Sequence, residues 1–191
     1  MNPVSYQLKQ ISSLLSSIKV DYAVIGGVAV SVYSEPRLTM DIDVSILLAA
    51  DRLGLFLKAA KRYGLTPIPA GINKFVKATG VIPMGFSKNR IKGRCDFIIA
   101  QNALEYLTIK RARSKKLYSV KVKLIRAEDL VIHKAVSDRP RDLEDARGIL
   151  IRQGDKLDMK YVSYWLKRIA EANHDPQLYS TFKNLIKSAR I

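Results

Sequence analysis

Apolar residues recur at helical spacing near the start of the chain and again throughout its last third. A first amphipathic helix is predicted over residues 4–18, where positions separated by four or three residues are apolar: Val4, Leu8, Ile11, Leu15 and Ile18. From residue 127 onward the same periodicity predicts four more helices, over residues 127–137, 141–152, 158–172 and 177–189. The C-terminal third is therefore expected to be entirely helical.

The region between these helices has the short apolar runs that are typical of strands. Strands are predicted over residues 22–25, 40–48, 93–100 and 118–125. Helices are expected in a buried run that ends at Pro36, over residues 51–64, and over residues 102–112 with Asn102 as the cap. Prolines and glycines interrupt residues 65–92, which are expected to form turns and short strands.

This order of elements predicts an α/β (α+β) fold. A small mixed β-sheet core with flanking helices is expected over residues 1–126, followed by a C-terminal helical region over residues 127–191.

One predicted strand carries two aspartates on a single face. In the stretch RLTMDIDVSI, Ile42 and Val44 alternate with Asp41 and Asp43. Residues i and i+2 of a strand share a face with Cα atoms roughly 6.5 Å apart. Their carboxylates can converge on a magnesium ion, which prefers oxygen ligands, or the aspartates can lie on an exposed face with Asp41 capping a turn.

Two further features fit a site that binds magnesium and phosphate. Gly26 and Gly27 end a buried strand and open a helix, where a phosphate can approach the backbone; two glycines also commonly just make a turn. Asp96 is a single acid on another apolar strand, suited to bind a second metal ion and to accept a proton, or to pair with its neighbour Arg94.

Charge is distributed unevenly along the chain. The net charge is +16, and residues 51–126 hold 18 Lys/Arg against three acids, a net charge of +15. This concentration favours a polyanionic partner, with RNA as the expected one, although a generally basic protein would look the same. No apolar run approaches the roughly 20 residues of a membrane span, so no membrane partner is expected.

The lone cysteine indicates the compartment. Cys95 has no partner for an internal disulfide, which fits a cytoplasmic location. It is expected to be a small buried residue rather than a nucleophile.

The stretch VIGGVAVSVYSEPRLTMDIDVSI resembles the signature of the DNA polymerase β-type nucleotidyltransferase superfamily: a Gly-Gly or Gly-Ser pair, nine to thirteen residues, then Asp-x-Asp. RLTMDID, together with a lysine followed by Asp-x-x-Asp in AEDLVIHKAVSDRPRDLEDARGIL, is similar to the AbiEii-like branch, which includes toxin nucleotidyltransferases. The resemblance covers roughly residues 20–152.

The resemblance implies a role for each matching residue. Gly26 and Gly27 would hold a nucleoside triphosphate, and two Mg²⁺ ions would bind Asp41, Asp43 and Asp96. Arg37 and Thr39 would contact the phosphates of the nucleotide or position the metal-binding strand. Lys134 would reach the phosphates or orient the acids. Asp142 and Asp145 lie on one helical face, either as supporting residues of the site or simply paired with Arg139, Arg141 or Lys134.

The implied activity is magnesium-dependent transfer of NMP from an NTP to an acceptor hydroxyl, with an RNA or tRNA 3′ end as first choice. Two alternatives remain open: the same chemistry on a protein or an aminoglycoside-like small molecule, and an inactive nucleic-acid- or protein-binding module of the same fold. The AbiEii-like resemblance also implies a toxin–antitoxin partner protein.

Overall fold

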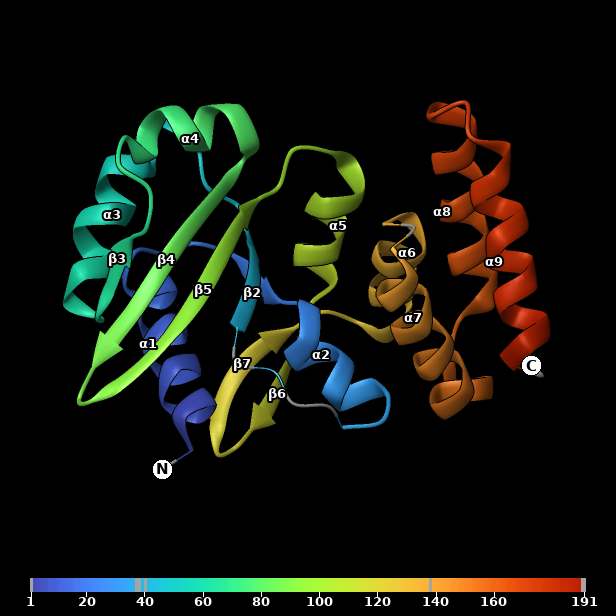
Figure 1. Cartoon of the computed structure of the whole chain (residues 1–191), viewed down its shortest axis with the longest axis horizontal. Coiled ribbons are helices and arrows are strands. Elements are labelled where there is room, and N and C mark those ends of the chain that lie inside the picture. Colours follow the sequence, from blue (N-terminus) through green and yellow to red (C-terminus); the bar gives the residue numbers. More distant parts are fainter. Residues whose placement is uncertain (1, 37–38, 40, 138, 190–191) are drawn as a thin grey trace. The chain divides into compact units, whose positions relative to one another are not determined.

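The computed structural model describes residues 2–36, 39, 41–137 and 139–189. Its α-helices, drawn in Figure 1, are α1 (Pro3–Ser17), α2 (Gly26–Tyr33), α3 (Leu53–Arg62), α4 (Ile72–Thr79), α5 (Ala103–Arg111), α6 (Ala127–Val136), α7 (Pro140–Gln153), α8 (Met159–Ala172) and α9 (Pro176–Ala189). Its strands are β1 (Tyr22–Val24), β2 (Asp41–Ile46), β3 (Leu65–Pro67), β4 (Val81–Lys88), β5 (Ile91–Ile99), β6 (Arg113–Leu117) and β7 (Val120–Leu124). Two short 3-10 helices lie at Ala50–Arg52 and Gly154–Lys156.

The chain divides into two compact units. Unit 1 comprises Met1–Val28 and Leu38–Ile125, and unit 2 comprises Ala29–Arg37 and Arg126–Ile191. The first boundary falls within α2, so the start of this helix belongs to the sheet and the rest packs with the C-terminal helices.

Unit 1 is built on one mixed seven-stranded sheet with the order β3-β4-β5-β2-β1-β7-β6. The pairs β2–β5 and β1–β7 are parallel, and the other neighbours are antiparallel. A sheet with flanking helices confirms the predicted α/β fold class. Within the described part of the chain, no helix has both the length and the apolar composition that a membrane span requires.

One face of the sheet packs against α1 and α3. Tyr6 of α1 contacts Phe86 of β4, with ring centroids 6.1 Å apart, and Phe56 of α3 contacts Phe97 of β5 at 5.0 Å. In Figure 1, β4 and β5 pass in front of α1. Because side chains alternate along a strand, the neighbours of these buried residues project from the opposite face.

Unit 2 is a bundle in which α6 packs on α7 and α8, and α9 packs on α7 and α8. Its core includes the fully buried side chains of Val131, Ile149, Leu166 and Phe182. The end of α2 joins this bundle, since Gln153 donates a hydrogen bond to the Tyr33 carbonyl at 2.8 Å.

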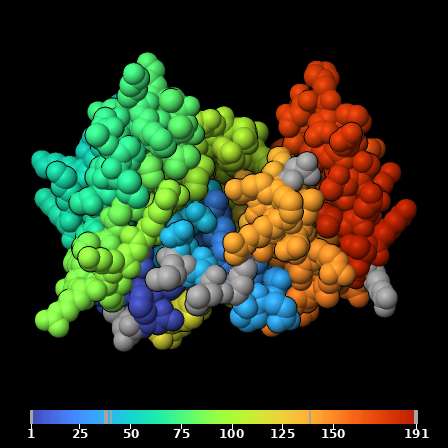
Figure 2. Space-filling model, in the orientation of Figure 1, coloured from blue at the N-terminus to red at the C-terminus, as the bar shows by residue number. Residues whose placement is uncertain are grey.

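The prediction for residues 65–92 was wrong in two respects. The segment contains a helix, α4, bounded by Gly71 and Gly80, both in the left-handed region, and an eight-residue strand, β4. Pro83 lies within β4 although this strand has neighbours on both sides, a position that proline usually avoids. The β4–β5 hairpin turns at Asn89 and projects from the surface of unit 1, at the lower left of Figure 2.

Strand β6 was also missed. Of its five residues, RSKKL, only Leu117 is buried, because β6 lies at the edge of the sheet. An edge strand with four exposed residues has no apolar alternation for a sequence pattern to reveal.

Candidate functional site

Strand β2 directs two carboxylates away from the covered face of the sheet. Ile42, Val44 and Ile46 are fully buried, whereas Asp41 is exposed and Asp43 is half-buried. Complete burial of one face fixes the register of the strand, since a slip of one residue would bury both aspartates. The acidic residues therefore occupy the opposite face, where Ser45 is buried and α5 contacts β2, but where the end of the strand at Asp41 is exposed. The exposed part of this face, around the aspartates, is called the open face below.

Strand β5 adds Asp96 to the same face. It runs parallel to β2, and Asp96 is the register partner of Asp43. Adjacent strands lie about 4.8 Å apart, so the backbones of these two aspartates are neighbours. The sheet thus brings Asp41, Asp43 and Asp96 together on one face.

A guanidinium group lies among these carboxylates. The Nε and terminal nitrogens of Arg94 both donate to Asp96, each at 3.2 Å. The hydrogen bond and charge of Asp96 raise the pKa of Arg94, and the charges of Asp41 and Asp43 add to this. The pairing of Asp96 with Arg94, left open from the sequence, is present, and it offsets part of the like-charge repulsion.

The two glycines lie directly against the acidic strand. The Ile25 N–H donates to the Asp43 carbonyl at 2.9 Å, and Gly26 follows with φ of +60°. A Cβ on Gly26 would lie 2.8 Å from the Asp43 Cβ and closer still to the carboxylate. Only glycine fits there, because both the backbone conformation and the space exclude a side chain.

Gly27 makes a similar close approach to Thr39. A Cβ on Gly27 would lie 2.7 Å from the Thr39 hydroxyl, which itself donates to the Asp41 carbonyl at 3.2 Å. Gly26, Gly27, Thr39 and the aspartates of β2 are therefore packed directly against one another, with Gly27 itself buried. Arg37, predicted to bind the nucleotide, lies outside the described residues.

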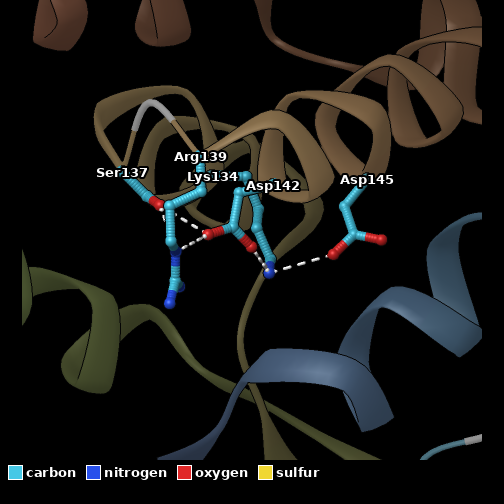
Figure 3. A network of polar contacts seen from close by, with 5 residues as sticks. All are labelled: Lys134, Ser137, Arg139, Asp142 and Asp145. Atoms are coloured by element: carbon cyan, nitrogen blue, oxygen red, sulfur yellow. Dashed lines mark hydrogen bonds and ion pairs between the residues drawn. The ribbon is translucent and has the colours of Figure 1, made fainter.

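A second polar cluster lies in unit 2, where α6 meets α7. Figure 3 shows Lys134 between two carboxylates: it pairs with Asp142 and, at 3.0 Å, with Asp145. Asp142 also accepts hydrogen bonds from Ser137 and, at 2.6 Å, from Arg139. These contacts include two of the pairings left open from the sequence, with Lys134 and with Arg139.

Burial and pairing act in opposite directions on Asp142. Its side chain is 6% exposed and that of Lys134 is 12% exposed. Burial raises the pKa of Asp142, but hydrogen bonds from Lys134 and Ser137, the charge of Lys134 and the bond from Arg139 lower it to about 2. Asp142 is therefore ionised at neutral pH, which explains why a lysine is stable on the buried side of α6.

The sequence matches no family model, and no curated protein matches it. Several solved structures do match. The chain resembles an antigenic nucleotidyltransferase-like protein from Paracoccidioides brasiliensis with a TM-score of 0.57 and 17% identity over 94% of this chain and 93% of that one. The solution structure of the antibiotic-resistance factor ANT(2'')-Ia gives a TM-score of 0.57 with 14% identity, covering 91% of this chain and 97% of that one.

A second structure of ANT(2'')-Ia, in complex with adenylyl-2''-tobramycin, gives a TM-score of 0.53 with 14% identity over 85% of this chain and 95% of that one. The chain has a nucleotidyltransferase fold. The AbiEii-like resemblance stays a prediction from the motifs.

Within this nucleotidyltransferase fold, the open face carries donors that suit magnesium. Carboxylate oxygens are the ligands that this ion prefers. Three carboxylate groups, those of Asp41, Asp43 and Asp96, project from neighbouring positions of β2 and β5. Among the described residues, however, no three His, Cys, Asp or Glu side chains already converge into a metal-binding group. Asp96 is turned to Arg94, so a cation bound to Asp96 would compete with this ion pair.

Cys95 takes no part in the open face of the nucleotidyltransferase fold. It is fully buried on the opposite face, and burial, with the charges of Asp43 and Asp96, raises the pKa of its thiol. The expectation of a buried, small apolar residue is confirmed.

The close approach of Gly26 to Asp43 gives a first prediction. We expect Gly26→Ala to lower the free energy of unfolding by about 1–3 kcal/mol, because alanine is strained at φ of +60° and its Cβ collides with Asp43. Urea denaturation measures the change. The control is Gly54→Ala in α3, where nothing lies within 4 Å of an added Cβ and stability should rise slightly. Equal stability of the two variants would contradict the geometry.

Proposed function

We propose that the chain transfers NMP from a nucleoside triphosphate to an acceptor hydroxyl and releases pyrophosphate. The observation that carries the proposal is the register of Asp43 with Asp96, beside Asp41 and the Gly26–Gly27 turn. Phosphoryl-type transfer depends mainly on positioning and on charge neutralisation, which such a surface can supply.

Each group on the open face has a task in this reaction. The backbone N–H groups at Gly26 and Gly27, at the start of α2, would bind the triphosphate. Asp41 and Asp43 would hold magnesium, with Asp96 as a third ligand. Bound there, the cation would polarise the phosphate and neutralise charge on the leaving group.

Asp96 would also accept the proton of the attacking hydroxyl. As the acceptor oxygen forms its bond to the α-phosphorus, the bond from that phosphorus to the β-phosphate oxygen breaks and the electron pair leaves with pyrophosphate. The proton of the acceptor would pass to a carboxylate oxygen of Asp96, in competition with the hydrogen bond from Arg94.

The acceptor we propose is the 3′ end of an RNA strand. The +15 charge of residues 51–126, all within or bordering unit 1, favours a polyanion. A second candidate is a small molecule, since the fold matches that of ANT(2'')-Ia in complex with an adenylylated tobramycin. An inactive binding module is disfavoured because all three carboxylates are present.

Incubation with each α-labelled NTP, magnesium and either total RNA or a panel of aminoglycosides tests the proposal. We expect label to appear in RNA, and only when magnesium is present. Label in an aminoglycoside alone would select the second candidate. No transfer to either acceptor, from a chain shown to be folded, would contradict nucleotidyl transfer to both.

A further inference from the structure

The hairpin formed by β6 and β7 concentrates positive charge at the edge of the sheet, drawn in yellow in Figure 1. Residues 106–127 contain no acidic residue. The exposed cationic side chains of the hairpin are Arg113, Lys115, Lys116, Lys121 and Lys123. No carboxylate of the hairpin itself can therefore neutralise them.

The pairing of the two strands brings like charges together. Lys116 lies directly opposite Lys121 in the antiparallel register, and Lys123 lies opposite Ser114. Like charges at directly opposed positions destabilise a sheet. Within the described part of the chain, no ion pair is found for Lys116, Lys121 or Lys123. An arrangement that costs stability and is relieved by an anion points to a ligand.

Lys121 and Lys123 alternate onto the face of the sheet that also carries Asp43 and Asp96, but Ala23 and Ser45 lie between them and are buried, and α5 contacts β1 and β2 there. Val122 and Leu124 are buried, and Leu124 is in register with Val24 and, through it, with Val44 on the face covered by α1 and α3. The alternate residues Lys121 and Lys123 therefore share the opposite face with Asp43 and Asp96. Lys123 and Asp43 are two strands and two residues apart, a Cα separation of about 12 Å.

An aromatic ring stands at the tip of the hairpin. Tyr118 and Ser119 both have positive φ, as a two-residue type I′ turn requires, and Tyr118 is 56% exposed. Lysines beside an exposed aromatic ring are the combination with which proteins hold single strands, the cations on phosphates and the ring on a base.

We propose that the β6–β7 hairpin is a surface, outside the acidic site, that binds the backbone of a single-stranded RNA acceptor. The choice of RNA rests on the proposed function. Lys116, Lys121 and Lys123 hold successive phosphates, and Tyr118 stacks on an unpaired base.

RNA binding by the full chain, measured without NTP across a series of salt concentrations, tests the surface. We expect Lys116→Gln/Lys121→Gln to weaken binding of a single-stranded RNA about 20-fold at 0.1 M salt and to lower the salt slope by about 1.4, since each phosphate contact to a single strand contributes about 0.7. The stability of this variant should not fall, because two opposed charges are removed. Tyr118→Asn, which tolerates the positive φ, should weaken binding about tenfold.

The control is Lys58→Gln/Lys61→Gln, an equal change of charge at two exposed positions of α3, on the other side of the sheet. Equal losses in the two double variants would overturn the proposal, and so would tighter binding of DNA than of RNA of the same sequence. If the hairpin substitutions leave transfer to RNA unaffected, the hairpin is not the RNA-binding surface, but the proposed nucleotidyl transfer stands. Binding of RNA through the hairpin without transfer to any acceptor would support the RNA-binding surface and contradict the proposed nucleotidyl transfer.

Discussion

Asp43→Asn is expected to lower the rate of nucleotidyl transfer about 1,000-fold while leaving the fold intact. Asparagine has the shape of aspartate but not its charge, so it binds poorly the divalent cation that would neutralise charge on the triphosphate. In the absence of magnesium the variant should stay folded, since the loss of the attraction between Asp43 and Arg94 is offset by relief of its repulsion with Asp41 and Asp96. Activity should thus fall without unfolding of the protein.

Single-turnover rates with labelled NTP and thermal unfolding with and without magnesium measure the two effects. Asp51→Asn is the matched control, because Asp51 is an exposed aspartate of the same unit outside the open face. It should leave the rate unchanged. Full transfer by Asp43→Asn would exclude the open face as the site of chemistry, whereas magnesium stabilising the wild type but not Asp43→Asn would support it.

The carboxylates of β2 were predictable because burial on one face of that strand is complete. Because Ile42, Val44 and Ile46 are all buried, the side chains of Asp41 and Asp43 must project from the other face of the strand. The alternation of apolar and acidic residues in the sequence shows this directly. Asp96 was predicted from the pattern of its own strand. Its register with Asp43 depends on which strands pair, and no local pattern encodes that.

The parts that could not be predicted depend on contacts between distant segments. Helix α4 forms between two glycines in the left-handed region, in a segment whose prolines suggested turns. Strand β6 forms because its backbone pairs with β7 at the edge of the sheet. The spacing of Asp142 and Asp145 predicted a shared helical face. That both would meet Lys134 follows from the way α6 packs on α7, which only the structure reveals.

Lys134→Met is expected to lower the free energy of unfolding by about 3–5 kcal/mol, the largest stability effect we predict. Methionine fills similar space but leaves Asp142 and Asp145, 6% and 8% exposed, without the ammonium group between them. Urea denaturation at pH 7 measures the loss. Arg141→Met, an exposed cation on α7, is the control and should change stability by less than about 0.5 kcal/mol.

The pH dependence separates this buried pairing from a general loss of charge. In the wild type the pKa of Asp142 falls from its ordinary value of 3.8 to about 2, so the folded state binds fewer protons than the unfolded one between these values. The stabilisation, about 2 kcal/mol, is complete above about pH 4 and is lost as the pH falls towards 2. Without Lys134 the pKa of Asp142 rises, and stability should fall less steeply over that interval. If Lys134→Met and the wild type lose stability in parallel between pH 4 and 2, the lysine does not set the ionisation of Asp142, and its place on the buried side of α6 needs another explanation.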